Sequence, residues 1–306
     1  MNKKENTAYS TLTQKFNLLK NEPLKRYTSF KIGGPADLLA LPKDQTELKK
    51  LIKQASDLDV PVTLLGGGTN VLITDKGIRG LVIVTRQLNA NIHIIETQLN
   101  EKIIFVEAGV RLSKVCQFAI NHSLTGIEFA AGIPGTVGGA IMMNAGTESG
   151  SMSDIVNAIE VLNQKTLAIE TIDGKDLDFS YRHLNQPGII VAAKLTLTPG
   201  DQNKIEETFK QNLIQKNATQ PVSFASAGCF FKNPVSGKPA GELIEKTGLK
   251  GMRINDAMVS RIHANYIINV NAASCEDVLL LKQQIQQAVF EKYHIQLETE
   301  VRVQGE

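Results

Sequence analysis

A run of glycines between residues 126 and 146 constrains this chain more than any other stretch of its sequence. The segment reads GIEFAAGIPGTVGGAIMMNAG. Because glycine has no Cβ, such a backbone can turn repeatedly and approach a ligand closely, and amide groups presented in this way favour a phosphate. The spacing is not the G-x-G-x-x-G of a Rossmann turn and lacks its strand-turn-helix context. A phosphate cradle and a set of tightly packed turns both stay open for this stretch taken alone.

A second glycine cluster, Gly66-Gly67-Gly68-Thr69-Asn70, follows the predicted strand VTLL upstream. A strand that runs into a glycine loop gives a second place where backbone amides can reach a ligand. The presence of two such clusters in one chain strengthens the phosphate-cradle interpretation of the first.

Composition excludes several classes of protein. The 306 residues suffice for two domains, and 42% apolar with 21% charged residues is ordinary for a soluble globular protein. A net charge of +2 and the absence of tryptophan give no support for a nucleic-acid or membrane partner. No apolar run approaches the ~18 residues of a membrane helix, and the N-terminus lacks a signal-peptide core. We therefore expect a cytoplasmic protein, a monomer or weak oligomer, that binds small molecules.

Hydrophobic periodicity predicts an α/β arrangement up to about residue 200. Residues 1–22 are expected to form a short amphipathic helix, with Leu12, Phe16 and Leu19 on one face. Asp44 and Glu47 form a predicted capping box for a helix that ends before Pro61. Strands are predicted at LVIVT, NIHIIET, KIIFVEAGV, IVNAIEVLN, LAIETID and IIVAAKLTLT, and a helix near residues 112–120 is expected to bury Cys116 on its apolar face.

The helix predicted near residues 200–219 is interpreted as a domain boundary, after which the chain restarts with its own elements. These are a loop at 221–239, a helix near AGELIEKTG, a strand at YIINV, a long helix beginning near Ser274 and a final strand LETEVRVQG. The long helix should bury Val278, Leu281, Ile285, Ala288 and Tyr293, and the final strand should alternate Leu297, Thr299, Val301 and Val303 on one face. We predict an extension at 1–22, a two-lobed domain at 23–200 (lobes near 23–85 and 86–200) and a second domain at 201–306.

Chemistry-bearing residues gather in three places. The loop Ser226 to Pro234 presents Cys229 after a small Ser-Ala-Gly run and before two phenylalanines, although for this loop taken alone a core cysteine on a tight turn is the favoured explanation. Tyr181-Arg182 ends a predicted hairpin, where the arginine is either solvated or a carboxylate clamp. Cys275 falls in the first turn of the long helix, where the helix N-terminus could lower a thiol pKa. The three cysteines are an odd number without a C-x-x-C pair, so neither a disulfide framework nor a zinc site is suggested.

The order of these segments along the chain closely resembles the UDP-N-acetylenolpyruvoylglucosamine reductase (MurB) family. The resemblance covers residues 24–305 and rests on a set of short motifs: Gly66 to Asn70, Ala131 to Gly146, Tyr181-Arg182, the Ser226 to Pro234 loop, Gly241-Glu242-Leu243-Ile244, Gly248-Leu249-Lys250-Gly251, and Glu298-Thr299-Glu300-Val301-Arg302. The short connection from Asn233 to Gly241 resembles the subtype that lacks a long inserted substrate loop. A shared FAD-binding superfamily would explain only the two glycine clusters.

This resemblance implies an α+β protein with a two-part FAD-binding domain of the vanillyl-alcohol-oxidase/PCMH type and a smaller α+β substrate-binding domain. FAD is the implied cofactor, NADPH the co-substrate, and no metal is implied. The implied FAD-binding residues are Gly66, Gly67, Gly68, Thr69, Asn70, Gly132, Ile133, Pro134, Gly135, Thr136, Gly138, Gly139, Asn144, Ala145 and Gly146. The implied substrate-binding residues are Tyr181, Arg182, Ser226 and Asn233. An Asn-Pro turn is the alternative role for Asn233.

The family chemistry implies two half-reactions, with NADPH reducing the flavin and flavin N5 then giving a hydride to C3 of the enolpyruvyl sugar nucleotide. Proton delivery to C2 completes UDP-N-acetylmuramate, a peptidoglycan precursor. The resemblance places Arg182 and Glu300 at the substrate carboxylate and Cys229 as the proton donor. Serine is the commoner donor in the family, and cysteine also occurs. Glu300 is either protonated or offset by Arg182 and Arg302.

Two other classes of protein compete with this interpretation. Another FAD oxidoreductase, acting on an alcohol or hydroxy acid, would share the glycine clusters but not the Cys229 loop with Glu300. A flavin or sugar-nucleotide binding module without turnover would leave these reactive residues without a role.

Overall fold

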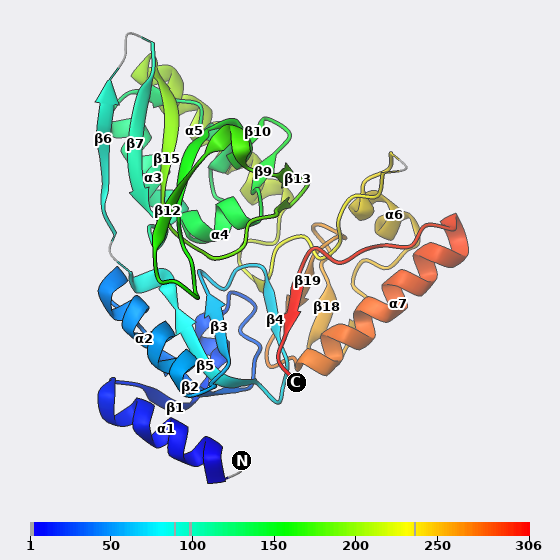
Figure 1. Cartoon of the computed structure of the whole chain (residues 1–306). Coiled ribbons are helices and arrows are strands. Elements are labelled where there is room, and N and C mark those ends of the chain that lie inside the picture. Colours follow the sequence, from blue (N-terminus) through cyan, green and yellow to red (C-terminus); the bar gives the residue numbers. More distant parts are fainter. Residues whose placement is uncertain (1–2, 89, 98–99, 236) are drawn as a thin grey trace. The chain divides into compact units, whose positions relative to one another are not determined.

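The computed structural model describes residues 3–88, 90–97, 100–235 and 237–306, which divide into two compact units. Unit 1 comprises residues 1–18, 40–67 and 83–216, and unit 2 comprises residues 19–39, 68–82 and 217–306. The chain therefore passes between the units several times. Elements carry the labels of Figure 1.

Unit 1 is built on an antiparallel sheet in the order β12-β11-β15-β7-β6. The short strand β8 also pairs with the long strand β15. Strand β15 carries the run IIVAAKLTLTP, whose β-branched residues suit a central strand. The strands are β6 (Ile92–Thr97), β7 (Lys102–Glu107), β8 (Leu124–Thr125), β11 (Val156–Leu162), β12 (Ile169–Asp173) and β15 (Ile189–Pro199).

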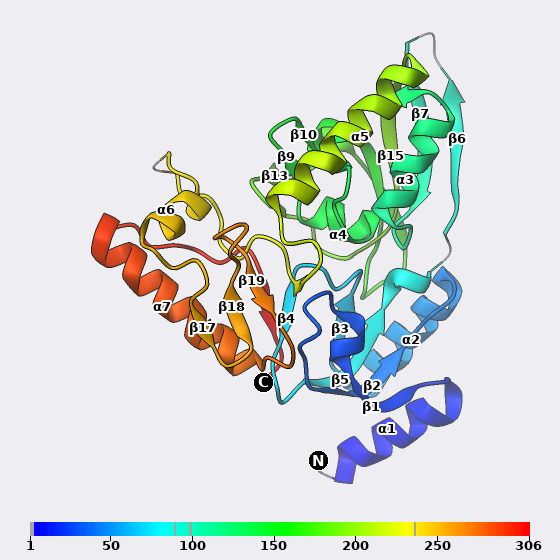
Figure 2. The ribbon, with the colours of Figure 1, turned by 180° about the vertical axis from the view of Figure 1, so that it is seen from behind.

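Helices cover one face of this sheet. Figure 2 shows α3 and α5 lying over β7 and β15, and the short helix α4 also packs on these strands. The helices of unit 1 are α1 (Lys3–Lys15), α2 (Gln45–Asp57), α3 (Leu112–Asn121), α4 (Val137–Met142) and α5 (Gln202–Thr219). Its remaining strands are β3 (Val62–Leu65), β9 (Gly146–Thr147), β10 (Gly150–Ser151), β13 (Phe179–Ser180) and β14 (His183–Leu184).

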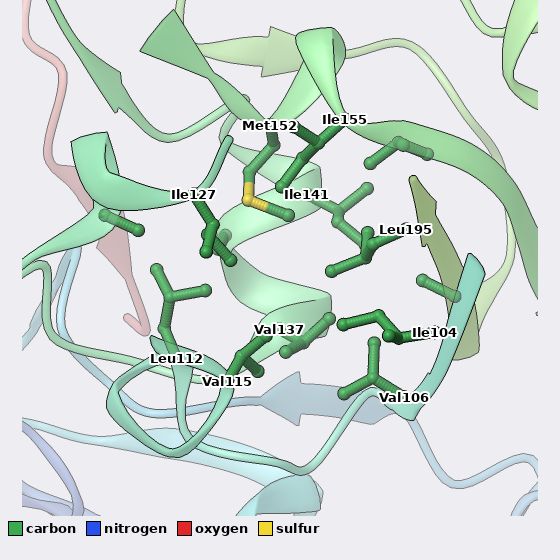
Figure 3. Close-up of a cluster of buried hydrophobic side chains, with 14 of the residues drawn as sticks. Ile104, Val106, Leu112, Val115, Ile127, Val137, Ile141, Met152, Ile155 and Leu195 are labelled. Carbon is green, nitrogen blue, oxygen red and sulfur yellow. The ribbon is translucent and has the colours of Figure 1, made fainter. Parts of the chain in front are cut away.

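The core of unit 1 is organised around α4. In Figure 3, Val137 and Ile141 of this helix lie between α3 side chains and the side chains of the sheet. The buried partners include Leu112 and Val115 on α3, and Ile104, Val106 and Leu195 on the strands, all fully or nearly fully buried. Because α4 carries two adjacent glycines, Gly138 can approach β7 so closely that an added Cβ would lie 2.9 Å from the Ala108 Cβ.

Unit 2 contains an antiparallel sheet in the order β16-β19-β18-β17, against which α7 packs (Figure 1). Strands β4 and β20 pair in parallel, with Val71 opposite Arg302, and β1, β2 and β5 are neighbours in another sheet. The elements are β1 (Leu19–Pro23), β2 (Pro35–Ala40), β4 (Val71–Ile73), β5 (Ile78–Val84), β16 (Ala225–Ser226), α6 (Ala240–Lys246), β17 (Arg253–Ile254), β18 (Ala257–Val259), β19 (Ile267–Asn269), α7 (Cys275–Tyr293) and β20 (Arg302–Gln304).

Most predicted elements are present, including the α2 start at Asp44 and the buried face of that helix. The capping box is only half formed, because Asp44 accepts from the Glu47 amide while Glu47 accepts from the Lys43 amide. Two assignments were wrong. Leu19 lies in β1 and not on the N-terminal helix, and the final strand β20 is short, which leaves Val303 44% exposed.

The long helix α7 buries different residues from those predicted. Val289 is fully buried, whereas Ala288 and Tyr293 are only half-buried, because the helical period drifts over nineteen residues. On α5, Ile205 and Phe209 are buried and Leu213 is exposed. The predicted functional domains at 1–22, 23–200 and 201–306 stay a prediction, since compact units are defined by packing alone.

The described part of the chain has no helix long and apolar enough to cross a membrane. Across the same residues, no group of three or more His, Cys, Asp and Glu side chains could hold a metal ion.

Candidate functional site

The two glycine clusters meet at the backbone level in unit 1. A Cβ added at Gly67 would lie 2.8 Å from the Gly135 Cα and 3.3 Å from the Thr136 nitrogen. A Cβ added at Gly66 would lie 3.1 Å from the Thr136 Oγ1 atom. Residues with a side chain could reach this approach only if the two loops moved apart. Glycines at 66, 67 and 135 thus allow the two glycine-rich segments that the sequence singles out to pack closely against each other.

The amides of the two clusters are not equivalent. At the start of α4, the Val137 and Gly138 amides donate to the carbonyls of Val110 (2.9 Å) and Ala108 (3.0 Å), and the Gly139 amide donates to Thr136 Oγ1 (3.4 Å). Among the described residues, by contrast, the amides of Gly66, Gly67 and Gly68 donate no backbone hydrogen bond. An anion in this region would therefore find its donors in the 66–68 loop, and the α4 glycines contribute close packing.

This arrangement fits the pyrophosphate of a dinucleotide. Gly66 and Gly67 are half-buried, and Gly68 has a left-handed φ of 64° that turns the chain at this point. Its carbonyl accepts from the Ser29 amide at 2.9 Å, which fixes the turn. Within the described ranges, these three successive glycines donate no backbone hydrogen bond, and a bound phosphate needs such donors in a backbone loop.

The end of the central glycine stretch holds the Tyr181-Arg182 turn. Asn144, with a φ of 39°, donates from Nδ2 to the Ser180 carbonyl (3.1 Å) and accepts at Oδ1 from the Ser153 amide (3.0 Å). The Arg182 guanidinium lies 5.1 Å from the centroid of the Tyr181 ring and donates to the Asn144 carbonyl at 3.5 Å. Tyr181 and Arg182, which the sequence analysis placed at the end of a hairpin, form the turn between two short strands, β13 and β14.

In unit 2, the Cys229 loop is fixed by the residues that follow the thiol. The Phe230 amide donates to the Asn265 carbonyl (2.7 Å), and the Phe230 carbonyl accepts from the Glu300 amide (2.9 Å). The Asn265 side chain makes two further bonds to the Phe231 backbone, at 2.9 and 2.8 Å. Both phenylalanine side chains are 1% exposed. Cys229 therefore sits on a loop clamped between the segment before β19 and the segment before β20.

Tyr266 interacts with both Cys229 and Glu300. The Tyr266 hydroxyl donates to Gln220 Oε1 at 2.8 Å and is also hydrogen-bonded with the Cys229 side chain. Burial, then the charges of Cys229 and Glu300, raise the pKa of Tyr266 well above its usual range. The Tyr266 hydroxyl thus stays protonated over the pH range in which an ordinary thiol loses its proton.

The backbone of Glu300 is held on both sides. Its amide bonds to Phe230, and its carbonyl accepts from the Asn70 Nδ2 group at 3.1 Å. The Asn70 carbonyl in turn accepts from the Arg302 amide at 3.1 Å. Asn70, the last residue of the Gly66–Asn70 cluster, is therefore hydrogen-bonded, within unit 2, to the segment that contains Glu300.

Two other predicted substrate residues lie on the same loop. Ser226 belongs to β16, and its carbonyl accepts from the Ser29 hydroxyl at 2.6 Å. Asn233 accepts at Oδ1 from the Ala240 amide (3.0 Å), so its side chain orients the start of α6. Asn233 therefore has a structural role as a hydrogen-bond acceptor at the start of α6, in addition to the predicted contact with substrate.

The other two cysteines are buried core residues. Cys116 lies on the apolar face of α3, as predicted, and burial raises the pKa of its thiol to about 12. Burial and the Asp75 carboxylate likewise raise the pKa of the Cys275 thiol to about 12. Asp75 occupies the N-terminus of α7, accepting from the Cys275 and Glu276 amides at 2.8 and 3.1 Å. The idea that the helix lowers this pKa is thus wrong, because a carboxylate already neutralises the helix end.

We expect iodoacetamide to label Cys229 much faster than Cys116 or Cys275 in the folded protein near pH 8. A thiol pKa of about 12 lies far above the ~8.5 of an ordinary cysteine, so each buried cysteine has at least roughly a thousandfold less thiolate than an unperturbed thiol. Mass spectrometry of the three cysteine peptides measures the rates. In urea the three should react alike, and equal rates in the folded state would contradict the expectation.

The structure groups the predicted site residues in two sets. Unit 1 contains Gly66, Gly67, the central glycine stretch with Asn144, and Tyr181 and Arg182. Unit 2 contains Asn70, Ser226, Cys229, Asn233 and Glu300. Sequence reasoning missed Tyr266, Gln220 and Asn265. Tyr266 was predicted only as the start of the strand YIINV, and no motif marked its hydroxyl.

Models of two known domains match this chain. Residues 36–171 match the model of an FAD-binding domain, and residues 220–304 match that of the UDP-N-acetylenolpyruvoylglucosamine reductase C-terminal domain. An FAD-binding domain followed by a second domain that presents a thiol and a carboxylate is typical of a flavin-dependent oxidoreductase.

Relatives match nearly the whole chain. The UDP-N-acetylenolpyruvoylglucosamine reductase of Syntrophus aciditrophicus is 42% identical over 291 residues, which cover 94% of this chain and 92% of that protein. That of Lactiplantibacillus plantarum is 41% identical, with coverages of 94% and 93%. The crystal structure of the Thermus caldophilus reductase superposes with a TM-score of 0.77 at 35% identity, covering 92% of this chain and 97% of that one. The chain therefore belongs to the UDP-N-acetylenolpyruvoylglucosamine reductase family, and the expected α+β fold class with an FAD-binding domain is confirmed.

Proposed function

We propose that this protein reduces UDP-N-acetylglucosamine enolpyruvate to UDP-N-acetylmuramate, with FAD as cofactor and NADPH as the source of electrons. The observation that carries the proposal lies in the region matched by the family's C-terminal domain, where the Glu300 amide donates at 2.9 Å to the carbonyl of Phe230, the residue after Cys229. An acid next to a carboxylate-binding group is what the second half of this reaction needs. The location in the cytoplasm belongs to the same proposal.

The glycine clusters are proposed to hold FAD. The Gly66–Gly68 amides would bind its pyrophosphate, and the Gly132–Gly139 and Asn144–Gly146 segments would approach the cofactor closely. When bound, FAD supplies the hydride that adds to C3 of the enol ether. The other steps require groups of the protein, which must stabilise developing charge and deliver one proton.

Cys229 is proposed to donate that proton to C2 of the substrate. Its S–H bond breaks and the C2–H bond forms, with the electron pair coming from the enolate-like carbon skeleton. Arg182 is proposed to bind the substrate carboxylate, where negative charge accumulates as hydride arrives. Glu300 is proposed to act at the same carboxylate, where either its protonated form donates a hydrogen bond or Arg182 and Arg302 offset its charge.

The proposal is tested on the purified protein in two measurements. We expect a bound-flavin absorbance spectrum, and NADPH oxidation that depends on UDP-N-acetylglucosamine enolpyruvate. A flavoprotein that oxidises NADPH but ignores this substrate would indicate an FAD oxidoreductase of different specificity. A colourless protein with intact folding would contradict the cofactor assignment.

We expect the protonation half-reaction to slow at alkaline pH. A thiol of ordinary pKa, about 8.5, is protonated below that pH and becomes a thiolate above it, and a thiolate has no proton to give. The rate at which substrate reoxidises the reduced flavin should therefore fall above pH ~8.5. A Cys229→Ser variant keeps a protonated hydroxyl in this range and should lack the fall. Superimposable pH profiles for the two proteins would rule out Cys229 as the titrating donor.

A further inference from the structure

Tyr266 lies next to the Cys229 loop, because Asn265, the residue before it, accepts from the amide of Phe230, the residue after Cys229, at 2.7 Å. Its ring is 8% exposed and lies edge-on to His263, with 5.1 Å between ring centroids. Backbone bonds fix its position, since its amide donates to the His263 carbonyl (3.0 Å) and its carbonyl accepts from the Ser260 amide (2.9 Å). A buried phenol held at both ring and backbone has little freedom to move its hydroxyl away from the thiol.

The Tyr266 hydroxyl has two partners and one hydrogen. Gln220 Oε1 accepts from it at 2.8 Å, and the Cys229 side chain is its second hydrogen-bond partner. While Cys229 is a thiol, the Tyr266 hydroxyl donates its hydrogen to Gln220, and a lone pair of the phenol oxygen can accept from the S–H group. Once Cys229 has lost its proton, the same hydrogen can turn to the sulfur.

We propose that Tyr266 is a positioning residue for proton transfer, whose hydroxyl orients the Cys229 thiol and then stabilises the thiolate left after the proton goes to substrate C2. The inference rests on the proposed function for its catalytic meaning. The Tyr266 O–H bond stays intact throughout, and the thiolate is reprotonated from water at the end of the cycle. Tyr266 therefore raises the acidity of Cys229 without donating the proton itself.

The charges around Cys229 explain why such a partner is needed. The titratable groups on the segments packed against its loop are His263, Glu300 and Arg302, with the Lys232–Glu298 pair 3.5 Å apart. Burial, more than the nearby Lys250, lowers the pKa of His263, so it is neutral in the pH range where Cys229 titrates. The Glu300 charge contributes to the raised pKa of Tyr266, so it disfavours a negative charge at that hydroxyl. Tyr266 is held protonated by its raised pKa, so its hydroxyl can donate to a thiolate across this whole range.

The test is the pH dependence of Cys229 alkylation in the holoenzyme without substrate. Iodoacetamide is the probe, and mass spectrometry of the Cys229 peptide reads the rate. In Tyr266→Phe we expect the Cys229 pKa to rise by about one unit or more, because a hydrogen bond to the charged form is lost. Tyr293→Phe, the same change at the end of α7, should leave the curve unchanged. Superimposable curves for Tyr266→Phe and the native protein would overturn the proposal.

A second variant guards against general misfolding. Gln220→Leu removes the competing acceptor, so the Tyr266 hydrogen is left for sulfur and the Cys229 pKa should fall. Shifts of opposite sign in the two variants cannot come from a common loss of structure. A shift in the same direction for both would overturn the idea that Gln220 and Cys229 share one hydrogen.

Single-turnover kinetics then link the thiol to the reaction. We expect Tyr266→Phe to slow flavin reoxidation by UDP-N-acetylglucosamine enolpyruvate about tenfold at neutral pH, with NADPH reduction of the flavin unchanged. In a Cys229→Ala background the same change should add no further loss, since Tyr266 acts through Cys229. An added loss there would assign Tyr266 a separate role. If the alkylation shifts appear while this substrate is not reduced, the proposed function fails and the Tyr266–Cys229 interaction stands.

Discussion

A Cys229→Ala variant is expected to lose the second half-reaction while keeping the first. General acid catalysis by a positioned side chain contributes about 10²- to 10⁴-fold, so flavin reoxidation by the substrate should slow by that factor. Reduction of the flavin by NADPH needs no proton from Cys229 and should keep its rate. Stopped-flow flavin absorbance, recorded separately for the two half-reactions, measures both rates.

Two comparisons make this result specific to the thiol. Cys229→Ser keeps a proton donor and should recover most of the lost rate at neutral pH. Cys116→Ala removes a thiol of the same size from the core of unit 1 and should affect stability only. If the Cys229→Ala variant reoxidised at the native rate, the proton would come from another group, and the assignment of Cys229 would be wrong.

The sequence singled out candidate residues better than it described their surroundings. Cys229 stood out because small residues precede it on a loop, whereas Glu300 was marked only by the family resemblance. What holds them together is not local. The bonds from Phe230 to Asn265 and to Glu300 join segments far apart in the chain, and their pairing depends on the tertiary fold. Tyr266 could not be identified from sequence, because a tyrosine that begins an apolar strand looks like any other core aromatic.

The three cysteines illustrate the same limit. Helical periodicity correctly placed Cys116 in the core, since an amphipathic pattern alone decides which face is buried. For Cys275 the local sequence predicted a shift of the thiol pKa in the wrong direction. Its position at a helix N-terminus favours a lowered thiol pKa, but Asp75, two hundred residues earlier, occupies that helix end and helps raise the pKa. A charged partner so distant in sequence cannot be recognised from the residues around Cys275.

The sequence singled out the central glycines, but their spacing alone does not show which of them serve close packing and which could present amides to a ligand. Packing requires Gly138, where an added Cβ would meet Ala108, and the amides at the start of α4 are used within the protein. The loop at 66–68 keeps its amides available. Because both kinds of glycine look alike in sequence, only the hydrogen-bond pattern separates a ligand-binding loop from a close contact.

Gly67→Ala is accordingly expected to weaken FAD binding about 10- to 100-fold. The new methyl group would lie 2.8 Å from the Gly135 Cα, and backbone atoms cannot give way as a flexible side chain can. Overpacking of this kind costs about 1–3 kcal/mol, and here the strain falls on the loop whose amides are proposed to hold the pyrophosphate. Flavin absorbance per mole of purified protein, followed by titration of the apoprotein with FAD, measures the loss.

The matched control is Gly200→Ala in the same unit. Its φ is not left-handed, and an added Cβ would meet only side-chain atoms of Ile205 and Thr125, at 3.2 to 3.5 Å. This variant should bind FAD as the native protein does, although both changes add one methyl group at a glycine. Equal FAD affinity in Gly67→Ala and the native protein would mean that the two glycine loops can separate freely, and the cofactor would then have to be held by other parts of the chain.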